Sequence, residues 1–294
     1  MKFICLSDVH LVAKNPKYRK DDLFSAQFGK LKFVFDYAKT HECAILQAGD
    51  LFDAPRSFPV LSEFIKLKGQ YPEVRIFSVY GQHDMKYRRK EHTNSHIAGM
   101  VGYIKYLDDK TLSVGNVDIS GCSWDSDFYK KCGGYDILLI HAPIAEKATY
   151  PGHNYWDATD FLERNKYNLI VCGDIHNKQF CINIGKRKIV NSGPMCRISK
   201  DLADHKPGFF VWDSDSSEIE WVEIPHESGS MVIDTEMPIF DNKNIFDNFV
   251  EAFKGIEFNG IDIDENLKAA LHGIDPGIIK IVDDIVLKCK NNCS

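Results

Sequence analysis

Potential metal ligands occur at five separate places in this sequence, each directly after a short apolar run. The five groups in chain order are Asp8 with His10, Gly49-Asp50 with Asp53, Gly81-Gln82-His83-Asp84, His141, and Gly173-Asp174-Ile175-His176. Mixed carboxylate, imidazole and amide groups suit Mn²⁺, Fe or Zn²⁺ better than Ca²⁺. No thiolate follows any of the runs, which argues against a structural zinc knot. A single Asp after a strand is often only a helix cap, but five such groups in series predict a shared metal site.

The apolar runs before these groups have the length and composition of strands that are buried on both faces. They cover residues 3–6, 44–47, 75–79, 136–140 and 169–172. Helix-period segments at 22–39, 59–68 and 157–165 lie between several of them, and Asp21 or Asp22 is a suitable N-cap for the first. This alternation predicts parallel β-α-β units and a central sheet covered by helices on both faces.

The carboxyl ends of the strands are where ligands bind in an open α/β sheet. We therefore expect the five groups to converge on one rim of the sheet. Gly49, Gly81 and Gly173 fit the tight turns that this requires, because glycine adopts backbone conformations that other residues avoid.

The sequence changes character after about residue 178. Segments at 179–184, 188–191, 208–213 and 218–224 resemble successive strands, so we expect an antiparallel portion or a second sheet there. From residue 226 the chain is acidic and helical, with an amphipathic segment at 244–253 and a last helix that begins at Pro276. We therefore divide the chain into a larger domain, residues 1–225, and a helical C-terminal segment, residues 226–294, which is a possible docking region for a partner.

Composition limits the classes of function. The net charge is −6, so binding to nucleic acid would depend on local basic patches and bound metal. No apolar run approaches the roughly 20 residues that span a bilayer, and Asp8 and His10 interrupt the apolar N-terminus, which argues against a secretory signal. The nine cysteines form no CxxC pair, as expected of small buried side chains in a reducing compartment. We expect a cytoplasmic protein, in the host cytoplasm if a phage encodes it.

The five groups resemble, in order and spacing, the five signatures of the calcineurin-like metallophosphoesterases. The resemblance covers roughly residues 1–180 and implies an α/β fold, a two-sheet sandwich flanked by helices, here with a short helical C-terminal appendage. Within that superfamily the chain is most similar to the DNA-repair nuclease branch, the SbcD-type subunits and their counterparts in bacteriophage recombination. The similarity to this branch rests on residues 48–53, on Ile189-Val190-Asn191-Ser192-Gly193-Pro194 and on Arg197.

The resemblance implies a site for two divalent cations, with Mn²⁺ expected and Mg²⁺ as the alternative. The implied ligands are Asp8, His10, Asp50 and His176 for one ion, and Asp50, Gln82, His141 and Asp174 for the other, with Asp50 bridging. Two ions about 3.5–4 Å apart clamp a phosphoryl group and generate hydroxide at neutral pH. His83 would stabilise or protonate the leaving oxygen, and Asp84 would orient His83. Asp53 would be either a turn residue or a substrate contact.

Two positions depart from the family pattern. Position 82 is normally Asn but is Gln here, and position 174 is normally His but is Asp here. The second change places a third carboxylate beside Asp8 and Asp50, which makes the site less electropositive and favours harder ions such as Mn²⁺ or Mg²⁺. We therefore expect the second metal site to be the more variable one.

Basic residues cluster after several of the signatures. The clusters are Lys14, Lys17, Arg19 and Lys20; Lys86, Arg88, Arg89 and Lys90; and Lys186, Arg187 and Lys188. Any one of them could be a solvated loop, but the first two follow site loops and so predict a positive rim that suits a long polyanion. Tyr18 and Tyr87 could stack on unpaired bases. The predicted substrate contacts are Lys17, Arg19, Arg88, Arg89 and Arg197.

These observations lead us to expect a Mn²⁺-dependent DNA exonuclease or endonuclease subunit that acts in repair or recombination. The resemblance implies DNA and an SbcC-type coiled-coil ATPase as partners, leaves a homodimer open and implies no membrane. The apolar face of the last helix would either pack on its own domain or dock that ATPase. Two alternatives remain: a small-molecule phosphodiesterase or phosphatase, and a degenerate subunit that holds DNA or a partner through an inactive centre.

Overall fold

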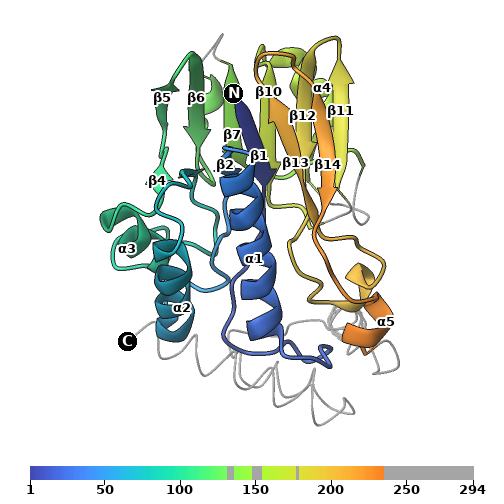
Figure 1. The fold of residues 1–294 in the computed structure, drawn as a ribbon. Coiled ribbons are helices and arrows are strands. Elements are labelled where there is room, and N and C mark those ends of the chain that lie inside the picture. Colours follow the sequence, from blue (N-terminus) through green and yellow to red (C-terminus); the bar gives the residue numbers. More distant parts are fainter. Residues whose placement is uncertain (131–135, 148–153, 177–178, 235–294) are drawn as a thin grey trace, which may run out of the picture. The chain divides into compact units, whose positions relative to one another are not determined.

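The computed structural model describes residues 1–130, 136–147, 154–176 and 179–234, and within these it contains two six-stranded sheets (Figure 1). The first has the order β14-β13-β1-β2-β3-β4, with β1 (Lys2–Leu6), β2 (Ala44–Gln47), β3 (Ile76–Ser78), β4 (Lys105–Tyr106), β13 (Gly208–Asp213) and β14 (Ile219–Glu223). The second has the order β11-β12-β10-β7-β6-β5, with β5 (Lys110–Val114), β6 (Val117–Cys122), β7 (Ile137–His141), β10 (Leu169–Gly173), β11 (Phe180–Ile184) and β12 (Arg187–Asn191). A short separate pair consists of β8 (Ile144–Ala145) and β9 (Trp156–Asp157).

Helices follow several of the strands along the chain. They are α1 (Leu23–Thr40), α2 (Phe58–Gly69), α3 (Asn94–Met100), α4 (Ala158–Arg164) and α5 (Gly229–Val232), with short 3₁₀ turns η1 (Phe128–Lys130) and η2 (Lys200–Leu202). The carboxylate of Asp22 accepts a hydrogen bond from the Ser25 amide and caps α1, as predicted. Asp157 caps α4 in the same way, through the amides of Thr159 and Asp160. The three helices predicted from periodicity are thus confirmed.

The five apolar runs are all strands, but they do not share one sheet. β1, β2 and β3 lie parallel in the first sheet, whereas β7 and β10 lie parallel in the second. The two-sheet sandwich implied by the resemblance is therefore confirmed, and the single central sheet inferred from the runs is wrong. The strands after residue 178 pair antiparallel, β11 with β12 and β13 with β14, as expected, but they form no sheet of their own. β11 and β12 extend the second sheet, while β13 and β14 extend the first as an antiparallel edge.

Strict alternation along β1 divides the apolar side chains between two cores. Phe3 and Cys5 pack between the two sheets, against side chains such as Leu139 and Val171 of the second sheet. Ile4 and Leu6 point the other way and belong to the core under α1 and α2. Successive strand residues face opposite sides of a sheet, so one short strand serves both cores.

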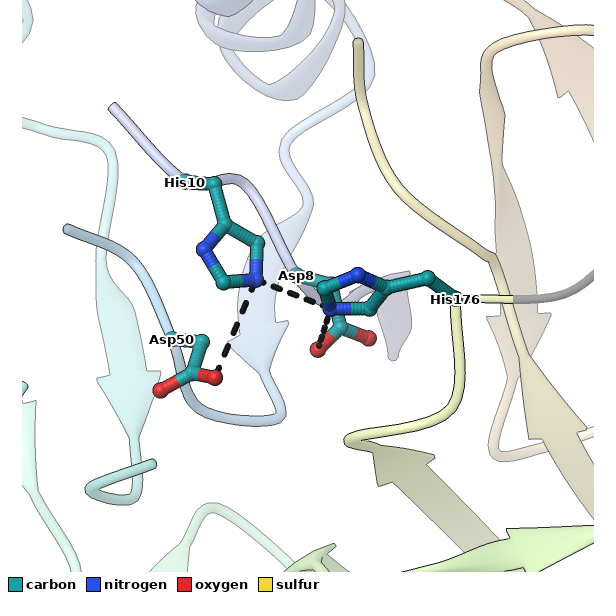
Figure 2. A group of neighbouring side chains, drawn as sticks. All are labelled: Asp8, His10, Asp50 and His176. Carbon is teal, nitrogen blue, oxygen red and sulfur yellow. Dashed lines mark hydrogen bonds and ion pairs between the residues drawn. The ribbon is translucent and has the colours of Figure 1, made fainter. Parts of the chain in front are cut away.

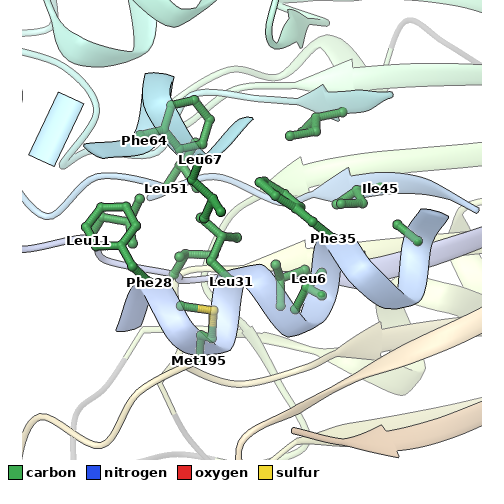
Figure 3. Packing of buried hydrophobic residues seen from close by; sticks show 14 of the residues in the cluster. Leu6, Leu11, Phe28, Leu31, Phe35, Ile45, Leu51, Phe64, Leu67 and Met195 are labelled. Atoms are coloured by element: carbon green, nitrogen blue, oxygen red, sulfur yellow. The ribbon is translucent and has the colours of Figure 1, made fainter. Parts of the chain in front are cut away.

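The outer core of the first sheet is built on α1 (Figure 3). Leu31 and Phe35 of that helix pack with Leu6, Ile45 and Phe64, which come from β1, β2 and α2. A third core lies on the outer face of the second sheet, under α4. Each sheet is thus held between an inner core and a helical layer, and its strand ends are left to form loops at the edge.

The six cysteines in the described ranges are all free, as expected from their spacing. Across these same ranges, no helix combines the length and the apolar composition needed to cross a bilayer. The helices expected at 244–253 and from Pro276, and most of the segment 226–294, lie outside the described residues.

Candidate metal centre

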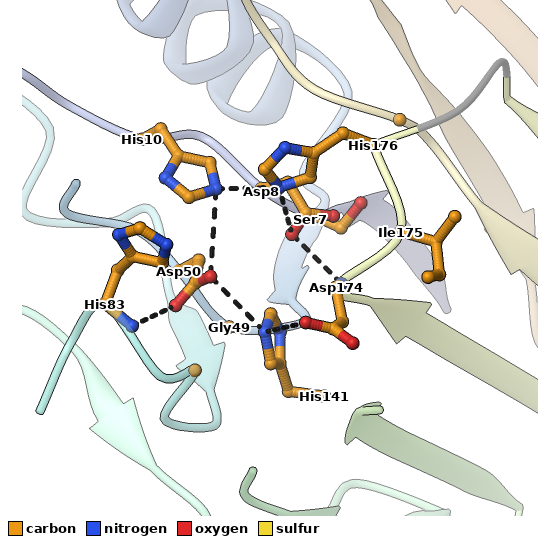
Figure 4. A network of polar contacts seen from close by, with 12 residues as sticks. Ser7, Asp8, His10, Gly49, Asp50, His83, His141, Asp174, Ile175 and His176 are labelled. Atoms are coloured by element: carbon orange, nitrogen blue, oxygen red, sulfur yellow. Dashed lines mark hydrogen bonds and ion pairs between the residues drawn. The ribbon is translucent and has the colours of Figure 1, made fainter. Parts of the chain in front are cut away.

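The carboxyl ends of strands from both sheets meet at one edge of the molecule, and this edge carries the predicted ligands (Figure 4). They are Asp8 and His10 after β1, Asp50 after β2, Gln82 after β3, His141 at the end of β7, and Asp174 and His176 after β10. We call these seven residues the metal edge. Because they come from two sheets, their convergence depends on how the sheets pack and not on one sheet alone.

The first set of predicted ligands is compact (Figure 2). One donor atom from each of Asp8, His10, Asp50 and His176 lies within 4.8 Å of all the others. The Nε2 atoms of His10 and His176 are 2.9 Å apart, and the Nε2 of His176 is 3.4 Å from Oδ1 of Asp8. Donor atoms grouped this closely match the ligand shell of a single cation.

The second set is connected by hydrogen bonds. The Nε2 atom of His141 lies 2.8 Å from Oε1 of Gln82, and Nε2 of Gln82 donates to Oδ1 of Asp174 at 2.7 Å. His141 Nε2 is also 3.4 Å from Oδ2 of Asp50, which is 3.7 Å from Nε2 of His10. Asp50 therefore faces both sets, the position that the resemblance implied for a bridging ligand. Within the described residues, the carboxylate and histidine donors of this second set do not form a group as compact as the first.

Unpaired buried oxygens test whether these residues fit a cation. Oδ2 of Asp8 and Oδ2 of Asp50 are buried and have no hydrogen-bond partner in the described structure. A buried acceptor without a partner costs about 1–3 kcal/mol, and more when it is charged. A divalent cation bound between these oxygens and the neighbouring imidazoles would remove that cost. The residues present therefore fit the divalent metals that the resemblance implies.

The loops that carry the ligands hold unusual backbone conformations. Asp8, His10, Asp50 and Asp174 have φ values of 50°, 48°, 54° and 105°, in a region that residues other than glycine rarely adopt. Strain of this kind costs about 1–3 kcal/mol per residue and concentrates at functional sites. Gly81 is needed for a different reason, since a Cβ atom there would lie 2.0 Å from Oδ1 of Asp50.

Backbone and carboxylate oxygens orient two of the histidines. Nδ1 of His141 lies 2.6 Å from the carbonyl oxygen of Ala48, which can only accept, so His141 donates its Nδ1 proton there. Nε2 of His141 is therefore the nitrogen that faces Gln82 and Asp50, and it would bind a metal only after giving up its proton. Nδ1 of His10 is 3.2 Å from Oδ1 of Asp53, and this contact directs Nε2 of His10 towards His176. Such outer contacts fix the tautomer and ring orientation of metal-binding histidines.

Charges at the metal edge shift its pKa values. Burial by itself lowers the pKa of His141, but the carboxylates of Asp50, Asp8 and Asp174 outweigh it and raise the pKa to about 10. Burial opposes ionisation of Asp8, yet His176 and the other histidines hold the pKa of its carboxyl below the usual value. The edge thus has a strong field that favours positive charge among its carboxylates.

His83 lies beside the first set with an exposed imidazole ring. Its side chain is 42% exposed, and Nδ1 lies 2.9 Å from the backbone carbonyl oxygen of Asp53. Its ring meets that of His10 edge-to-face at 4.8 Å. Asp53 thus contacts both histidines, through its carboxylate and through its backbone. From the sequence we predicted that Asp53 is either a turn residue or a substrate contact. The sequence did not predict its contacts with both histidines, because these depend on the geometry of the loop.

The structure does not place Asp84 beside His83 as its orienting partner. Asp84 is fully buried, and its carboxylate accepts hydrogen bonds from the amides of Asp50, Phe52 and Gly81 and from the hydroxyl of Ser95. Burial, with Asp50 nearby, raises the pKa of Asp84 to about 6. Asp84 therefore holds two site loops together, and the carbonyl oxygen of Asp53 orients His83 instead.

Two predicted substrate contacts are buried. Arg197 is 4% exposed, and it donates hydrogen bonds to the carbonyl oxygens of His205 and Glu227. Arg19 is 9% exposed, and it donates to the carbonyl oxygen of Arg197 and pairs with Asp21 at 2.6 Å. Neither guanidinium is available on the surface as the sequence suggested, because polar groups of neighbouring loops surround both.

The other three predicted contacts are exposed. Lys17 lies on the surface, as do Arg88 and Arg89 in a tight turn where Lys86 and Arg89 exchange backbone hydrogen bonds. Tyr87 stands at the tip of this turn and is 88% exposed. Arg88 pairs with Asp125 at 2.8 Å. The cluster at Lys186–Lys188 instead begins β12, whose parallel register with β10 places it at the strand end opposite the metal edge.

Ser192, part of the cue for the nuclease branch, and the nearby Met195 support the loop of the first ligand. The amide of Ser7 donates to the hydroxyl of Ser192 at 2.9 Å, and the amide of Met195 donates to the carbonyl oxygen of Asp8 at 3.3 Å. This segment therefore holds the strained turn at Asp8 from the side opposite Asp50.

Comparison with known proteins identifies one family. A family model described as calcineurin-like phosphoesterase matches residues 1–178. No curated protein matches the sequence significantly.

Several solved structures resemble the chain. The structure of TT1561 of Thermus thermophilus has a TM-score of 0.51 at 11% identity, over 76% of this chain and 99% of that chain. A novel archaeal phosphodiesterase has a TM-score of 0.41 at 15% identity, over 76% and 99%. A 5′-nucleotidase precursor from Thermus thermophilus has a TM-score of 0.44 at 9% identity, over 86% and 59%. At these identities the likeness to TT1561 concerns the fold alone.

Proposed function

The chain belongs to the calcineurin-like phosphoesterases, and from this membership we propose that it is a DNA nuclease subunit. Metal-dependent phosphoester chemistry follows from the family and from the grouped Asp and His donors. The proposal adds DNA as the substrate, Mn²⁺ as the preferred ion, a role in repair or recombination, and a coiled-coil ATPase as the partner.

The observation that carries the chemistry is the pair of unpartnered, buried oxygens, Oδ2 of Asp8 and Oδ2 of Asp50. Two divalent cations held at the metal edge would supply a hydroxide nucleophile and neutralise charge on the phosphoryl group. Asp50 faces both ligand sets and would be shared between them. The remaining residues of the metal edge would complete the ligand shell of each ion, as the resemblance implies.

His83 would assist the leaving group. Its Nδ1 proton is directed to the carbonyl oxygen of Asp53, so Nε2 is the atom that can carry a proton to the leaving oxygen. The ring lies next to His10 and is open to solvent. A substrate phosphate at the metal edge could therefore reach His83 without a rearrangement of the core.

Support for DNA comes from the turn that follows His83. Arg88 and Arg89 place two cations there, and Tyr87 presents a ring that could stack on an unpaired base. We expect the double change Arg88→Glu and Arg89→Glu to weaken DNA binding and to flatten its dependence on salt. Hydrolysis of a small diester should stay unchanged, because this turn contains none of the seven metal-edge residues.

A nuclease assay tests the proposal directly. The full chain is incubated with single- and double-stranded DNA and with bis(p-nitrophenyl) phosphate, in Mn²⁺, Mg²⁺ or EDTA. We expect cleavage of DNA and of the diester that requires an ion and is faster with Mn²⁺. His83→Ala should slow it by about 100-fold or more, whereas His41→Ala, an exposed histidine at the end of α1, should not. Intact DNA beside a hydrolysed diester would contradict the nuclease assignment.

One observation favours a small-molecule phosphodiesterase as the second candidate. With Arg19 and Arg197 buried, the exposed basic surface is smaller than the sequence suggested. A small-molecule enzyme would hydrolyse nucleotides or phosphomonoesters and would be insensitive to changes at Arg88 and Arg89. The same assay with these variants separates the two candidates.

A further inference from the structure

A pocket beside α1 is lined by an unusual number of buried cations. It has a volume of about 570 Å³, and its lining includes Arg19, Lys30 and Arg197 together with Asp21 and Phe33. None of the seven metal-edge residues lines it. We call the pocket that Arg19, Lys30 and Arg197 line the cationic pocket.

The positive charge of this pocket is incompletely balanced. Arg19 pairs with Asp21 at 2.6 Å. Glu227 also lines the pocket, but in the described part of the chain no ion pair within 4.0 Å joins it to Lys30 or Arg197. Lys30 is 9% exposed, and the one hydrogen bond recorded for its ammonium goes to the carbonyl oxygen of Met195 at 3.2 Å. Three basic side chains thus face two carboxylates, and the excess positive charge is costly because burial removes the water that would solvate it.

Two further features show that this charge is not relieved within the pocket. Nε of Arg19 is buried and has no hydrogen-bond partner in the described structure. Burial lowers the pKa of Lys30, and the guanidinium groups of Arg19 and Arg197 lower it further, while Cys196 and Asp21 act in the opposite direction. The local field therefore favours a negative group in a pocket that has room for one.

We propose that the cationic pocket is a second, metal-independent binding site for a phosphate group, carried by inorganic phosphate or by the end of a nucleotide. The excess positive charge calls for an anion, and a phosphate group offers several acceptor oxygens to the three basic side chains at once. Guanidinium groups also match the geometry of phosphate oxygens. The pocket exceeds the volume of a phosphate group, and Phe33 offers an apolar wall for the rest of a nucleotide.

The site is linked to the metal edge through one residue. Met195 accepts the hydrogen bond from Lys30 through its carbonyl oxygen and donates its amide to the carbonyl oxygen of Asp8. A phosphate in the pocket would thus lie one residue away from the loop that positions the first metal ligand. The proposal nevertheless stands apart from the nuclease assignment, because it needs neither metal nor catalysis.

Thermal unfolding of the EDTA-treated full chain tests the site. Phosphate at 10 mM should raise the Tm of the wild type by about 3 °C more than chloride at equal ionic strength. Lys30→Met should abolish that extra rise. It should also unfold at a higher temperature than the wild type without phosphate, because it removes an unbalanced buried charge. Lys32→Met, two residues along α1 at an exposed position, is the matched control and should respond as the wild type does.

The comparison between variants removes the general stabilising effect of phosphate on folded proteins, since that effect acts on all of them equally. Deoxyadenosine 5′-monophosphate and acetate identify the ligand. A nucleotide shift equal to that of phosphate assigns the site to the phosphate group alone, and a larger shift assigns it to a nucleotide. An acetate shift as large as that of phosphate, or an unchanged phosphate response in Lys30→Met, would overturn the proposal.

Discussion

The metal edge and the cationic pocket are two buried regions of opposite charge in one domain. At the metal edge, the buried Oδ2 atoms of Asp8 and Asp50 accept no hydrogen bond in the described structure, so the region favours a bound positive charge. In the cationic pocket, Lys30 and Arg197 lack carboxylate partners within the described ranges, so the region is short of negative charge. Each region has the charge imbalance that a bound ion of the opposite sign would correct.

The pKa values of two buried histidines reflect this difference in local charge. Burial alone would lower both pKa values, yet the carboxylates around His141 raise its pKa to about 10. His205 is packed near Arg197 and Lys30, and burial together with these cations lowers its pKa to about 4. The difference teaches that burial lowers the pKa of both histidines, and that the neighbouring charges either reverse this effect, as at His141, or reinforce it, as at His205.

The largest effect is expected where both ligand sets meet. Asp50→Asn keeps the shape of the side chain but removes the charge that both ions would share. We expect kcat/KM for the small diester to fall by roughly 1,000-fold, the upper end of what one electrostatic group supplies, and bound Mn²⁺ per chain to fall in parallel. Elemental analysis and diester kinetics measure this, with the exposed Asp160→Asn as control. If Asp50→Asn still bound both ions, the charge of Asp50 would not be needed for metal binding, and the proposed contrast between the metal edge and the cationic pocket would fail.

A smaller effect is expected from the residue that positions two histidines. Asp53→Ala removes the acceptor for Nδ1 of His10, and outer contacts of this kind are worth about 10–100-fold in metal affinity. Calorimetric titration with Mn²⁺ should show that loss, and Asp53→Asn, which keeps an acceptor oxygen, should restore most of the affinity. Equal affinities for Ala, Asn and wild type would mean that Asp53 is only a turn residue.

The pH dependence of the free energy of unfolding tests the charge around the cationic pocket. The pKa of His205 is lower in the folded state, about 4, than in the unfolded chain, about 6.5, so the unfolded chain binds the proton more tightly. The stability that depends on neutral His205 is complete above pH 6.5 and is lost as the pH falls towards 4. Between pH 7 and pH 5 the loss amounts to about 2 kcal/mol.

Urea unfolding of wild type and His205→Gln at both pH values isolates this contribution. Gln can still donate to the carbonyl oxygen of Pro194, the recorded partner of the His205 ring. The difference between the two proteins removes the contributions of the other ionisable groups, and it should shrink as the pH falls. A difference that stays constant from pH 7 to pH 5 would show that the pocket does not disfavour a further positive charge.

The smallest effect concerns the position that departs from the family pattern. Asp174→His removes one negative charge from the metal edge and adds an imidazole, which should shift the preference from Mn²⁺ towards Zn²⁺ by about tenfold. It also removes the carboxylate to which Gln82 donates its hydrogen bond. Competition calorimetry with the two metals measures the shift. An unchanged ratio of affinities would mean that the third carboxylate does not set the choice of ion.

Local sequence patterns were enough to predict most of the secondary structure. Each apolar run became a strand, and the N-cap at Asp22 and the helices near 22–39, 59–68 and 157–165 followed from periodicity and capping. The allocation of β7 and β10 to a second sheet did not follow, because a strand that is apolar on both faces fits either sheet equally well.

Local sequence patterns predicted which side chains could bind a metal, but not which groups each side chain would contact in the folded structure. Asp84 turned towards three backbone amides, which no sequence motif reveals. Arg19 and Arg197 looked like surface cations because long basic side chains are usually exposed, and only tertiary packing buries them here. Errors of this kind arise where several loops meet, since each loop then sets the surroundings of the others.

The origin of the ligands in two different sheets has a mechanical consequence. A metal ion bound by Asp8 and Asp50, which follow strands of the first sheet, and by His176, which follows a strand of the second, would link the two sheets. At a concentration 100 times its Kd, such an ion adds about 2.7 kcal/mol to the free energy of unfolding. The two sheets could then separate only after the metal dissociates. In a heated sample, the rate of metal loss would therefore set the rate at which the sandwich unfolds.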